Sequence, residues 1–188
     1  MSRVTDYLKT IGAEVSLTKN DYLPLMITGS ENLLPKEHKI KTPSAQIKSA
    51  LLLSGLNIHG ITTVVETKPT RDHTERLLKY LDFKFKLNKL KGGRTKIELN
   101  GPYEINAKDI KVASDPSSAA FFIVGALITP NSEIELKNIM LNPSRIAFID
   151  VLKKMGAKIT VKKTKKICGE DIGTVKVKYS RLKGVKIN

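Results

Sequence analysis

Two helix starts between residues 41 and 81 carry side chains that could take part in anion binding. Pro43 and Ser44 predict the first start, because proline fixes φ at a helical value and a serine hydroxyl can accept a hydrogen bond from a first-turn amide. Pro69 and Thr70 predict the second start, with Arg71 in its first turn. Unpaired amides at a helix start attract anions, so the first start indicates an anion site. A plain N-cap at Ser44 and a solvated Arg71 would explain the same residues.

Metal and disulfide chemistry find little support in the sequence. Cys168 is the only cysteine, so an intramolecular disulfide is excluded. A zinc site would have to rely on carboxylates and on His38, His59 and His73, which show no ligand spacing. We therefore expect no structural metal.

The net charge of +15 suggests a partner that carries phosphate, such as a nucleic acid. The lysines of residues 83–87 and 174–179 alternate with apolar residues, which is typical of hairpins with one solvated face, and aromatic residues for base stacking are few. We therefore expect no nucleic-acid partner. A basic chain can also steer a small anionic substrate, and a non-catalytic polyanion-binding module remains an alternative that only the charge supports.

No membrane segment is expected. The longest apolar run, residues 119–128, is about half as long as a bilayer crossing requires. Residues 1–7 lack the apolar core of a signal peptide. A cytoplasmic location is the resulting prediction.

The elements that would position the anion site can be predicted from periodicity. Residues 47–56 are apolar on nearly every face, which predicts a helix that is buried all round. Residues 61–65 are β-branched and predict a strand. The next helix, opened by Pro69 and Thr70, is amphipathic, with a stripe of Thr74, Leu77, Leu78 and Leu81.

The same stripe recurs twice, as Val4, Tyr7, Leu8 and Ile11 and as Phe148, Val151, Leu152 and Met155. Its copies begin 70 and 74 residues apart, at positions 4, 74 and 148, which is too long for a solenoid unit and indicates a repeated α/β module. Each stripe leads into a predicted hairpin, and Gly12 and Gly156 are expected to be the C-caps of two of the three helices. We expect the hairpin turns at residues 19–21, at residues 92–93 and, more loosely, within the lysine-rich residues 162–173.

The apolar helix is repeated as well. Asp115 and Pro116 predict its start, residues 119–128 are again apolar all round, and Pro130 ends it. A strand over 132–139 and a second helix start at residues 142–144 complete the pattern. Residues 106–180 are therefore predicted to mirror 38–100 element for element, as a βαβαββ module of the α/β (α+β) class. Residues 1–28 carry only a helix and a hairpin.

Four segments resemble, in order and spacing, the 5-enolpyruvylshikimate-3-phosphate synthase family: 44–56 (SAQIKSALLLSGL), 70–76 (TRDHTER), 115–121 (DPSSAAF) and 141–145 (LNPSR). The match runs through essentially all 188 residues. Ser-Ala-Gln at 44–46 and the TRDHTE segment resemble the glyphosate-tolerant type. The resemblance implies an inside-out α/β barrel of βαβαββ modules, incomplete here, with residues 1–112 in a first domain and 113–188 starting a second.

The resemblance also implies an activity, the transfer of the enolpyruvyl group of phosphoenolpyruvate to the 5-hydroxyl of shikimate 3-phosphate in aromatic amino-acid biosynthesis. No metal or organic cofactor is implied. By that resemblance, the Ser44 hydroxyl and the Ala45 amide would hold the shikimate phosphate, and Arg71 would contact it. Gln46 would hydrogen-bond the shikimate ring or phosphoenolpyruvate. Thr70 is ambiguous, since an N-cap would use the same hydroxyl, while Lys48, Asp72 and Asp115 are interpreted as structural.

The resemblance places the family's other substrate residues before Met1 and its catalytic aspartate beyond Ile187. We therefore expect part of the substrate site and no catalytic residue in these 188 residues, so that the isolated chain would be inactive unless separate chains supplied the flanking segments. The related UDP-N-acetylglucosamine enolpyruvyl transferase is an alternative with the same fold. The Ser-Ala-Gln and TRDHTE segments argue against it.

Overall fold

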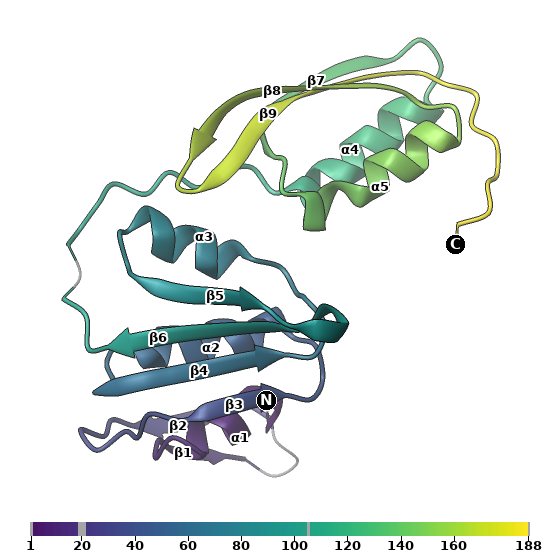
Figure 1. Cartoon of the computed structure of the whole chain (residues 1–188). Coiled ribbons are helices and arrows are strands. Elements are labelled where there is room, and N and C mark those ends of the chain that lie inside the picture. The colour runs from purple at the N-terminus through teal and green to yellow at the C-terminus, as the bar shows by residue number, and fades with distance from the viewer. Residues whose placement is uncertain (1, 19–21, 105, 188) are drawn as a thin grey trace. The chain divides into compact units, whose positions relative to one another are not determined.

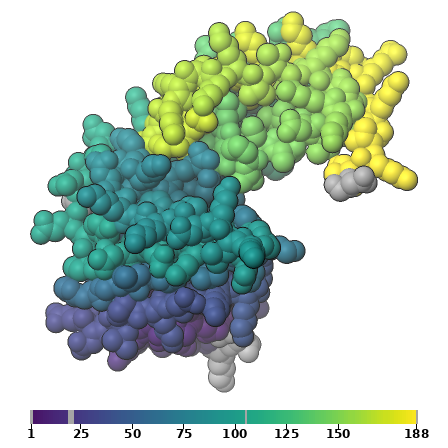
Figure 2. All heavy atoms as spheres, in the orientation of Figure 1, coloured from purple at the N-terminus to yellow at the C-terminus, as the bar shows by residue number. Residues whose placement is uncertain are grey.

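The computed structural model describes residues 2–18, 22–104 and 106–187. The chain forms two compact units, Met1–Ala107 and Lys108–Asn188 (Figure 1). Figure 2 shows one face of all heavy atoms, coloured from purple in the first unit to yellow at the end of the second. The sequence predicted a crossing between domains near residue 112, and the assignment of the two units to the two domains of the resembling family stays a prediction.

The first unit contains the predicted βαβαββ module, whose elements are β3 (Glu37–Ile40), α2 (Ala45–Gly55), β4 (Gly60–Glu66), α3 (His73–Tyr80), β5 (Phe85–Lys89) and β6 (Thr95–Gly101). Its four strands form one sheet in the order β3-β4-β6-β5. Strand β3 pairs parallel with β4, and the other neighbours are antiparallel. The helix and hairpin predicted before this module are α1 (Ser2–Lys9), β1 (Glu14–Leu17) and β2 (Leu25–Thr28).

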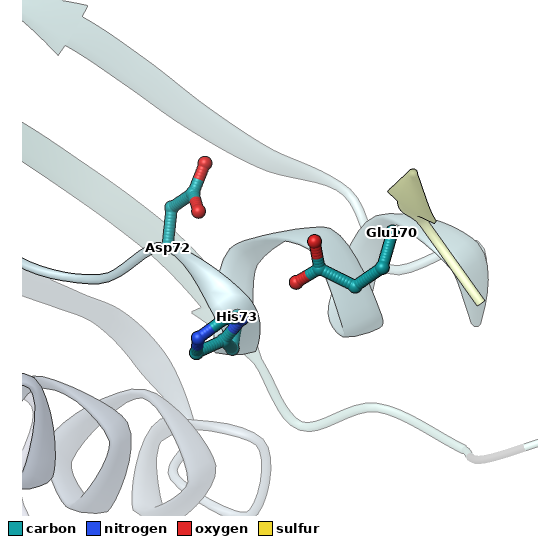
Figure 3. A group of neighbouring side chains, drawn as sticks. All are labelled: Asp72, His73 and Glu170. Carbon is teal, nitrogen blue, oxygen red and sulfur yellow. The ribbon is translucent and has the colours of Figure 1, made fainter. Parts of the chain in front are cut away.

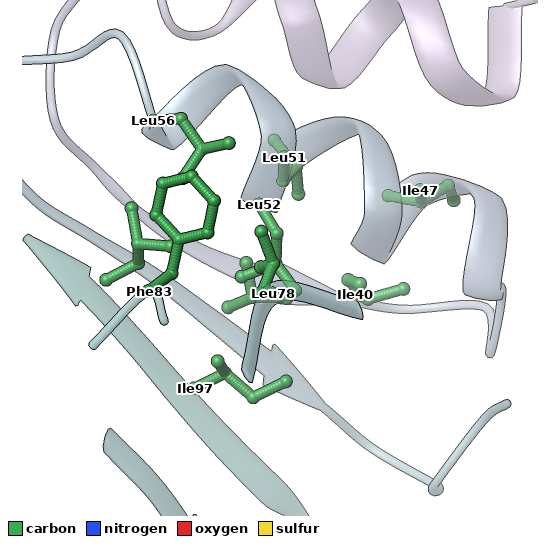
Figure 4. Close-up of a cluster of buried hydrophobic side chains, with 10 residues drawn as sticks. Ile40, Ile47, Leu51, Leu52, Leu56, Leu78, Phe83 and Ile97 are labelled. Atoms are coloured by element: carbon green, nitrogen blue, oxygen red, sulfur yellow. The ribbon is translucent and has the colours of Figure 1, made fainter. Parts of the chain in front are cut away.

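The core of the first unit lies between α2, α3 and the sheet (Figure 4), and its buried side chains are Ile40, Ile47, Leu51, Leu52, Leu56, Val64, Leu78, Phe83, Ile97 and Leu99. Val4 and Tyr7 of α1 pack against this cluster. The prediction that α2 is buried all round is wrong at Leu53, which is 50% exposed. An apolar side chain is buried only where another element covers it, and Leu53 is left uncovered.

Helix α3 begins later than the sequence predicted. It starts at His73 with Asp72 as its N-cap, three residues beyond Thr70. The amide of Thr70 donates to Glu66 Oε1 over 3.2 Å, and the Thr70 hydroxyl donates to the same oxygen. Because this carboxylate already satisfies the backbone and the side chain of Thr70, residues 70 and 71 stay in the loop.

Each of the three repeated helices ends at a residue with left-handed φ. Gly12 and Gly156 have φ values of 97° and 96°, which confirms the two predicted glycine C-caps. Asp82 takes the same place after α3 with φ of 63°. The predicted turn at Gly92 and Gly93 is confirmed, since both have positive φ. The turn predicted at residues 19–21 lies outside the described residues.

The second unit repeats most of the module, as α4 (Pro116–Ile128), β7 (Glu133–Met140), α5 (Pro143–Lys154), β8 (Lys158–Ile167) and β9 (Glu170–Lys178). The strands form one sheet in the order β7-β9-β8. The predicted mirror is incomplete, because the expected first strand is reduced to one parallel bridge between Ser114 and Ile139. Asp115 and Asn142 cap α4 and α5 through their side chains, as predicted.

The last hairpin differs from the loose lysine-rich connection that we expected. Strands β8 and β9 run to residues 167 and 170 and are joined by Cys168 and Gly169, with φ values of 47° and 84°. Two consecutive positive φ angles are those of a tight hairpin turn. The lysines of 158–166 are therefore strand residues, most of them with exposed side chains.

Helix α4 is buried on one side only. Ala119, Ile123 and Leu127 pack into the core of the second unit, but Phe121 is 82% exposed and Phe122 is also exposed. The prediction of burial all round is wrong here because the sheet covers only one side of the helix. No helix among the described residues has the length and apolar character to cross a membrane.

Two glycines of the second unit should respond oppositely to alanine. A Cβ on Gly173 in β9 would lie 2.5 Å from Leu141 Cδ1 and against the carbonyl oxygen of Lys162. We expect Gly173→Ala to lower the free energy of unfolding by about 1–3 kcal/mol. Gly125 in α4 has no atom within 4 Å of such a Cβ, so Gly125→Ala should raise stability by about 0.5–1 kcal/mol. Denaturant unfolding of both variants checks this, and equal effects would contradict the packing around β9.

Candidate functional site

A pocket of about 800 Å³ opens where the amino ends of α1 and α2 meet the start of α3, and it is lined by Ser2, Arg3, Val4, Ala45, Gln46, Ser49, Arg71, His73 and Thr74. Its volume is that of a small-molecule site. Three of the four predicted site residues, Ala45, Gln46 and Arg71, line it together. None of the described residues in this lining carries a carboxylate, whereas two carry guanidinium groups. The pocket is therefore suited to an anion.

Ser44, the fourth predicted residue, is the N-cap of α2. Its backbone is extended, with φ of −151° and ψ of 114°, and its hydroxyl oxygen accepts from the Ile47 amide over 3.5 Å. The N-cap interpretation is thus confirmed. It does not exclude a ligand, because a serine hydroxyl that accepts one hydrogen bond still has a proton to donate. The amides of Ala45 and Gln46, in the first turn of α2, have no carbonyl of a preceding turn to bind.

Gln46 is oriented by a residue that the sequence did not single out. Arg3 Nη2 donates to Gln46 Oε1 over 2.6 Å. A guanidinium can only donate, so the amide oxygen of Gln46 must face Arg3, and the amide nitrogen is left to donate to a ligand. Arg3 and Gln46 are 43 positions apart in the chain, and no local pattern predicts their contact.

Arg71 lies in the loop between Glu66 at the end of β4 and Asp72 at the start of α3. Its side chain is exposed and borders the pocket. The residue before it, Thr70, is bonded to Glu66. The residue after it, Asp72, forms an ion pair with Arg76 at 2.9 Å, so both neighbours of Arg71 are held by side-chain contacts.

Directly behind the pocket lies a buried ionic network of Lys48, Glu66 and Glu75. Lys48 Nζ is 2.7 Å from Glu75 Oε1 and 3.3 Å from Glu66 Oε2, and the Lys48 side chain is only 1% exposed. Burial raises the pKa of Glu75, although the hydrogen bond and charge of Lys48 oppose the shift. The interpretation of Lys48 as a structural residue agrees with these contacts. In the pocket wall, the hydroxyl groups of Ser49 and Thr74 are 2.6 Å apart and join α2 to α3.

Asp72 and His73 stand side by side at the start of α3 (Figure 3). The same view labels Glu170, which begins β9 in the second unit and accepts a hydrogen bond from Asn142 Nδ2 over 3.1 Å. Within either unit taken alone, the described side chains do not bring three potential metal ligands together.

Asp115, in the second unit, serves the helix start rather than a ligand. It accepts from the Ser118 amide at 2.9 Å and is paired with Arg145 at 2.7 Å. Desolvation opposes the effect, but the hydrogen bonds from the amides of Ser118 and Ser117 and the charge of Arg145 hold the pKa of Asp115 below its ordinary value. The pair joins two of the four segments on which the family resemblance was based.

Comparison with known proteins gives one consistent family. The profile of the family described as EPSP synthase (3-phosphoshikimate 1-carboxyvinyltransferase) matches residues 1–188. A 3-phosphoshikimate 1-carboxyvinyltransferase of Novosphingobium aromaticivorans is 40% identical over 188 residues, which are all of this chain and 43% of that protein. The chain thus spans less than half the length of the curated relatives that it matches.

Solved structures agree with the sequence comparison. The structure of an EPSP synthase from Acinetobacter baumannii has a TM-score of 0.82 and 39% identity, and the match covers 100% of this chain and 42% of that one. The enolpyruvyl transferase NikO from Streptomyces tendae has a TM-score of 0.63 at 16% identity, covering 95% of this chain and 42% of its own, which shows a shared fold only. The predicted fold of βαβαββ modules is confirmed.

The raised pKa of Glu75 gives a prediction about stability and pH. A carboxyl whose pKa is higher in the folded state binds its proton more tightly there. The free energy of unfolding therefore falls as the pH rises from the ordinary pKa of 4.5 through the raised pKa. Glu75→Gln removes this titration. We expect the stability of the parent, relative to Glu75→Gln, to fall as the pH rises above 4.5. Urea unfolding of both proteins across this range is the measurement, and a difference that grows with pH would contradict it.

Proposed function

Because this chain belongs to the EPSP synthase family of carboxyvinyl transferases, we propose that the protein containing it moves the enolpyruvyl group of phosphoenolpyruvate onto the 5-hydroxyl of shikimate 3-phosphate. In this proposal the 5-hydroxyl first adds, with its proton, across the carbon–carbon double bond of phosphoenolpyruvate, and loss of phosphate and a proton then restores the double bond. The residues of this chain bind and orient the substrate. None of them is proposed to transfer a proton.

The observation that carries the proposal is the pocket in which Ala45, Gln46 and Arg71 come together without a carboxylate in the described lining. Free first-turn amides and a nearby guanidinium are the groups that proteins use for phosphate. In our proposal the Ala45 amide and the Ser44 hydroxyl donate to the phosphate of shikimate 3-phosphate, and Arg71 pairs with its charge. Arg3 adds a second positive charge to the same pocket.

The family resemblance left open whether the side-chain amide of Gln46 donates or accepts, and the contact with Arg3 narrows this to donation. Since its amide oxygen is held by Arg3, Gln46 acts as a donor, through its amide nitrogen, to a ring oxygen of shikimate or to phosphoenolpyruvate. Thr70 is not assigned to the substrate, because its hydroxyl already donates to Glu66.

A polyanion-binding function is less well supported. Several lysines of the second unit are neutralised by neighbouring carboxylates, as in the pairs Lys176–Glu135 at 2.9 Å and Lys163–Asp171 at 2.8 Å. The described residues of the basic strands thus form a solvated face with internal ion pairs. The same proposal includes a cytoplasmic location and two small-molecule partners, phosphoenolpyruvate and shikimate 3-phosphate. The rest of the family's length would lie on the same chain or on another one.

The proposal is tested in a chimera in which residues 1–188 replace the matching segment of the Acinetobacter baumannii synthase. We expect Arg71→Ala to weaken the binding of shikimate 3-phosphate by about 1.5–3 kcal/mol, the scale of a charged hydrogen bond. Arg94→Ala is the matched control, because Arg94 lies in the turn before β6 and donates to Lys91 within that turn. Calorimetric titration gives both affinities. Equal affinities for parent and Arg71→Ala would exclude Arg71 from the site.

Ser44→Ala should have a smaller effect that is divided between binding and folding. A neutral hydroxyl contributes about 0.5–1.5 kcal/mol to binding, and removal of the N-cap lowers helix stability by about 1 kcal/mol. The melting temperature without ligand separates the second effect from the calorimetric affinity. A lower melting temperature with unchanged affinity would leave Ser44 as an N-cap only.

A further inference from the structure

Lys48 is an unusual residue for the interior of a small α/β unit. It lies on α2 between Gln46 and the apolar residues of the helix, and it is as completely buried as the neighbouring Ile47 and Leu51. Burying an ammonium group costs several kcal/mol unless it is paired and hydrogen-bonded. Replacement of such an ion pair by apolar residues is often neutral or stabilising, so stability alone does not explain its presence.

The two carboxylates that pair with Lys48 come from the segment that carries Arg71. Glu66 ends β4, and Glu75 lies in the first turn of α3. Lys48 therefore ties both flanks of the loop 67–72 to the first half of α2. The Ser49–Thr74 hydrogen bond is a third tie between the same two segments.

Glu66 uses each of its oxygens for a different element. Oε2 is the partner of Lys48, and Oε1 accepts both the amide and the hydroxyl of Thr70. These hydrogen bonds fix the position of Thr70, which is the residue immediately before Arg71. A continuous path of contacts thus leads from the ammonium group on α2 to Thr70, the residue before Arg71.

We propose that Lys48, Glu66 and Thr70 are positioning residues, which hold the Arg71 guanidinium at a fixed place relative to the first turn of α2 so that both can bind one phosphate. The proposal rests on the proposed function for the identity of that phosphate. Lys48 and Glu66 do not touch the substrate, because both are buried behind the pocket lining. Their effect on binding passes through Thr70 to Arg71.

Thr70 is the best place to test this path. Lys48→Met would leave two buried carboxylates without their cation, which endangers folding itself. Thr70→Val removes only the hydroxyl that donates to Glu66, and Thr70→Ser keeps it. In the chimera described above, we expect Thr70→Val to weaken shikimate 3-phosphate binding about fivefold to tenfold and Thr70→Ser to stay within about twofold of the parent, with an unchanged KM for phosphoenolpyruvate in both variants.

The decisive comparison is a double-mutant cycle. If Thr70 acts through Arg71, Thr70→Val should change the affinity by less than about twofold once Arg71→Ala is present. The same loss in both backgrounds, or no loss in either, would overturn the proposal. So would a loss that Thr70→Ser fails to restore.

Amide hydrogen exchange tests the positioning role in the absence of substrate. In the 188-residue chain, Thr70→Val should speed exchange of the Thr70 amide, which donates to Glu66, about fivefold or more, while the amide of Leu52 in α2 stays as protected as in the parent. Unchanged exchange at residue 70 would overturn the positioning role. If exchange changes as expected but the parent chimera does not bind shikimate 3-phosphate, the proposed function is wrong and the positioning of Arg71 stands.

Discussion

The first unit depends on the pairing of one buried cation with two carboxylates. Lys48 has no access to water, so its charge can persist only because Glu66 and Glu75 approach it to hydrogen-bond distance. These contacts fix the distance between α2 and the end of β4, and between α2 and the first turn of α3. Apolar packing alone permits small sliding movements of a helix on a sheet. A directional ion pair at the pocket end of the core restricts them where the binding groups lie.

The repeated helix-to-strand connection reverses the direction of the chain within a few residues. After α1, α3 and α5 the chain turns through Gly12, Asp82 and Gly156, and all three have positive φ. Glycine adopts this conformation without a Cβ penalty, and aspartate is among the few other residues that tolerate it. The three hairpins therefore start from equivalent geometry even though their sequences differ.

Local sequence patterns predicted what local interactions decide. Ser44 and Asp115 were predicted as helix caps from neighbouring residues alone, and their hydroxyl and carboxylate groups accept from amides three positions ahead. The site residues Ala45, Gln46 and Arg71 came from the family resemblance, and the structure brings them to one pocket.

The errors arose where an interaction that the periodic pattern does not encode decides the outcome. The start of α3 moved because the carboxylate of Glu66 competes for Thr70, and the Arg3–Gln46 contact joins segments 43 positions apart. Burial of α2 and α4 was overestimated because an apolar face is buried only where another element covers it. The tight turn at Cys168 and Gly169 was missed because the lysines around it resemble a loop in composition.

The hydrogen bond from Arg3 gives Gln46 a fixed polarity. A primary amide in a pocket can usually turn over and present either its oxygen or its nitrogen, so it tolerates ligands of both kinds. With its oxygen occupied, Gln46 offers only N–H groups, as do the free amides and the two guanidinium groups around it. A molecule that brought its own donor to this place would leave two donors facing each other without an acceptor. At Gln46 the pocket is therefore complementary to an acceptor oxygen, in addition to the positive charge of Arg3 and Arg71.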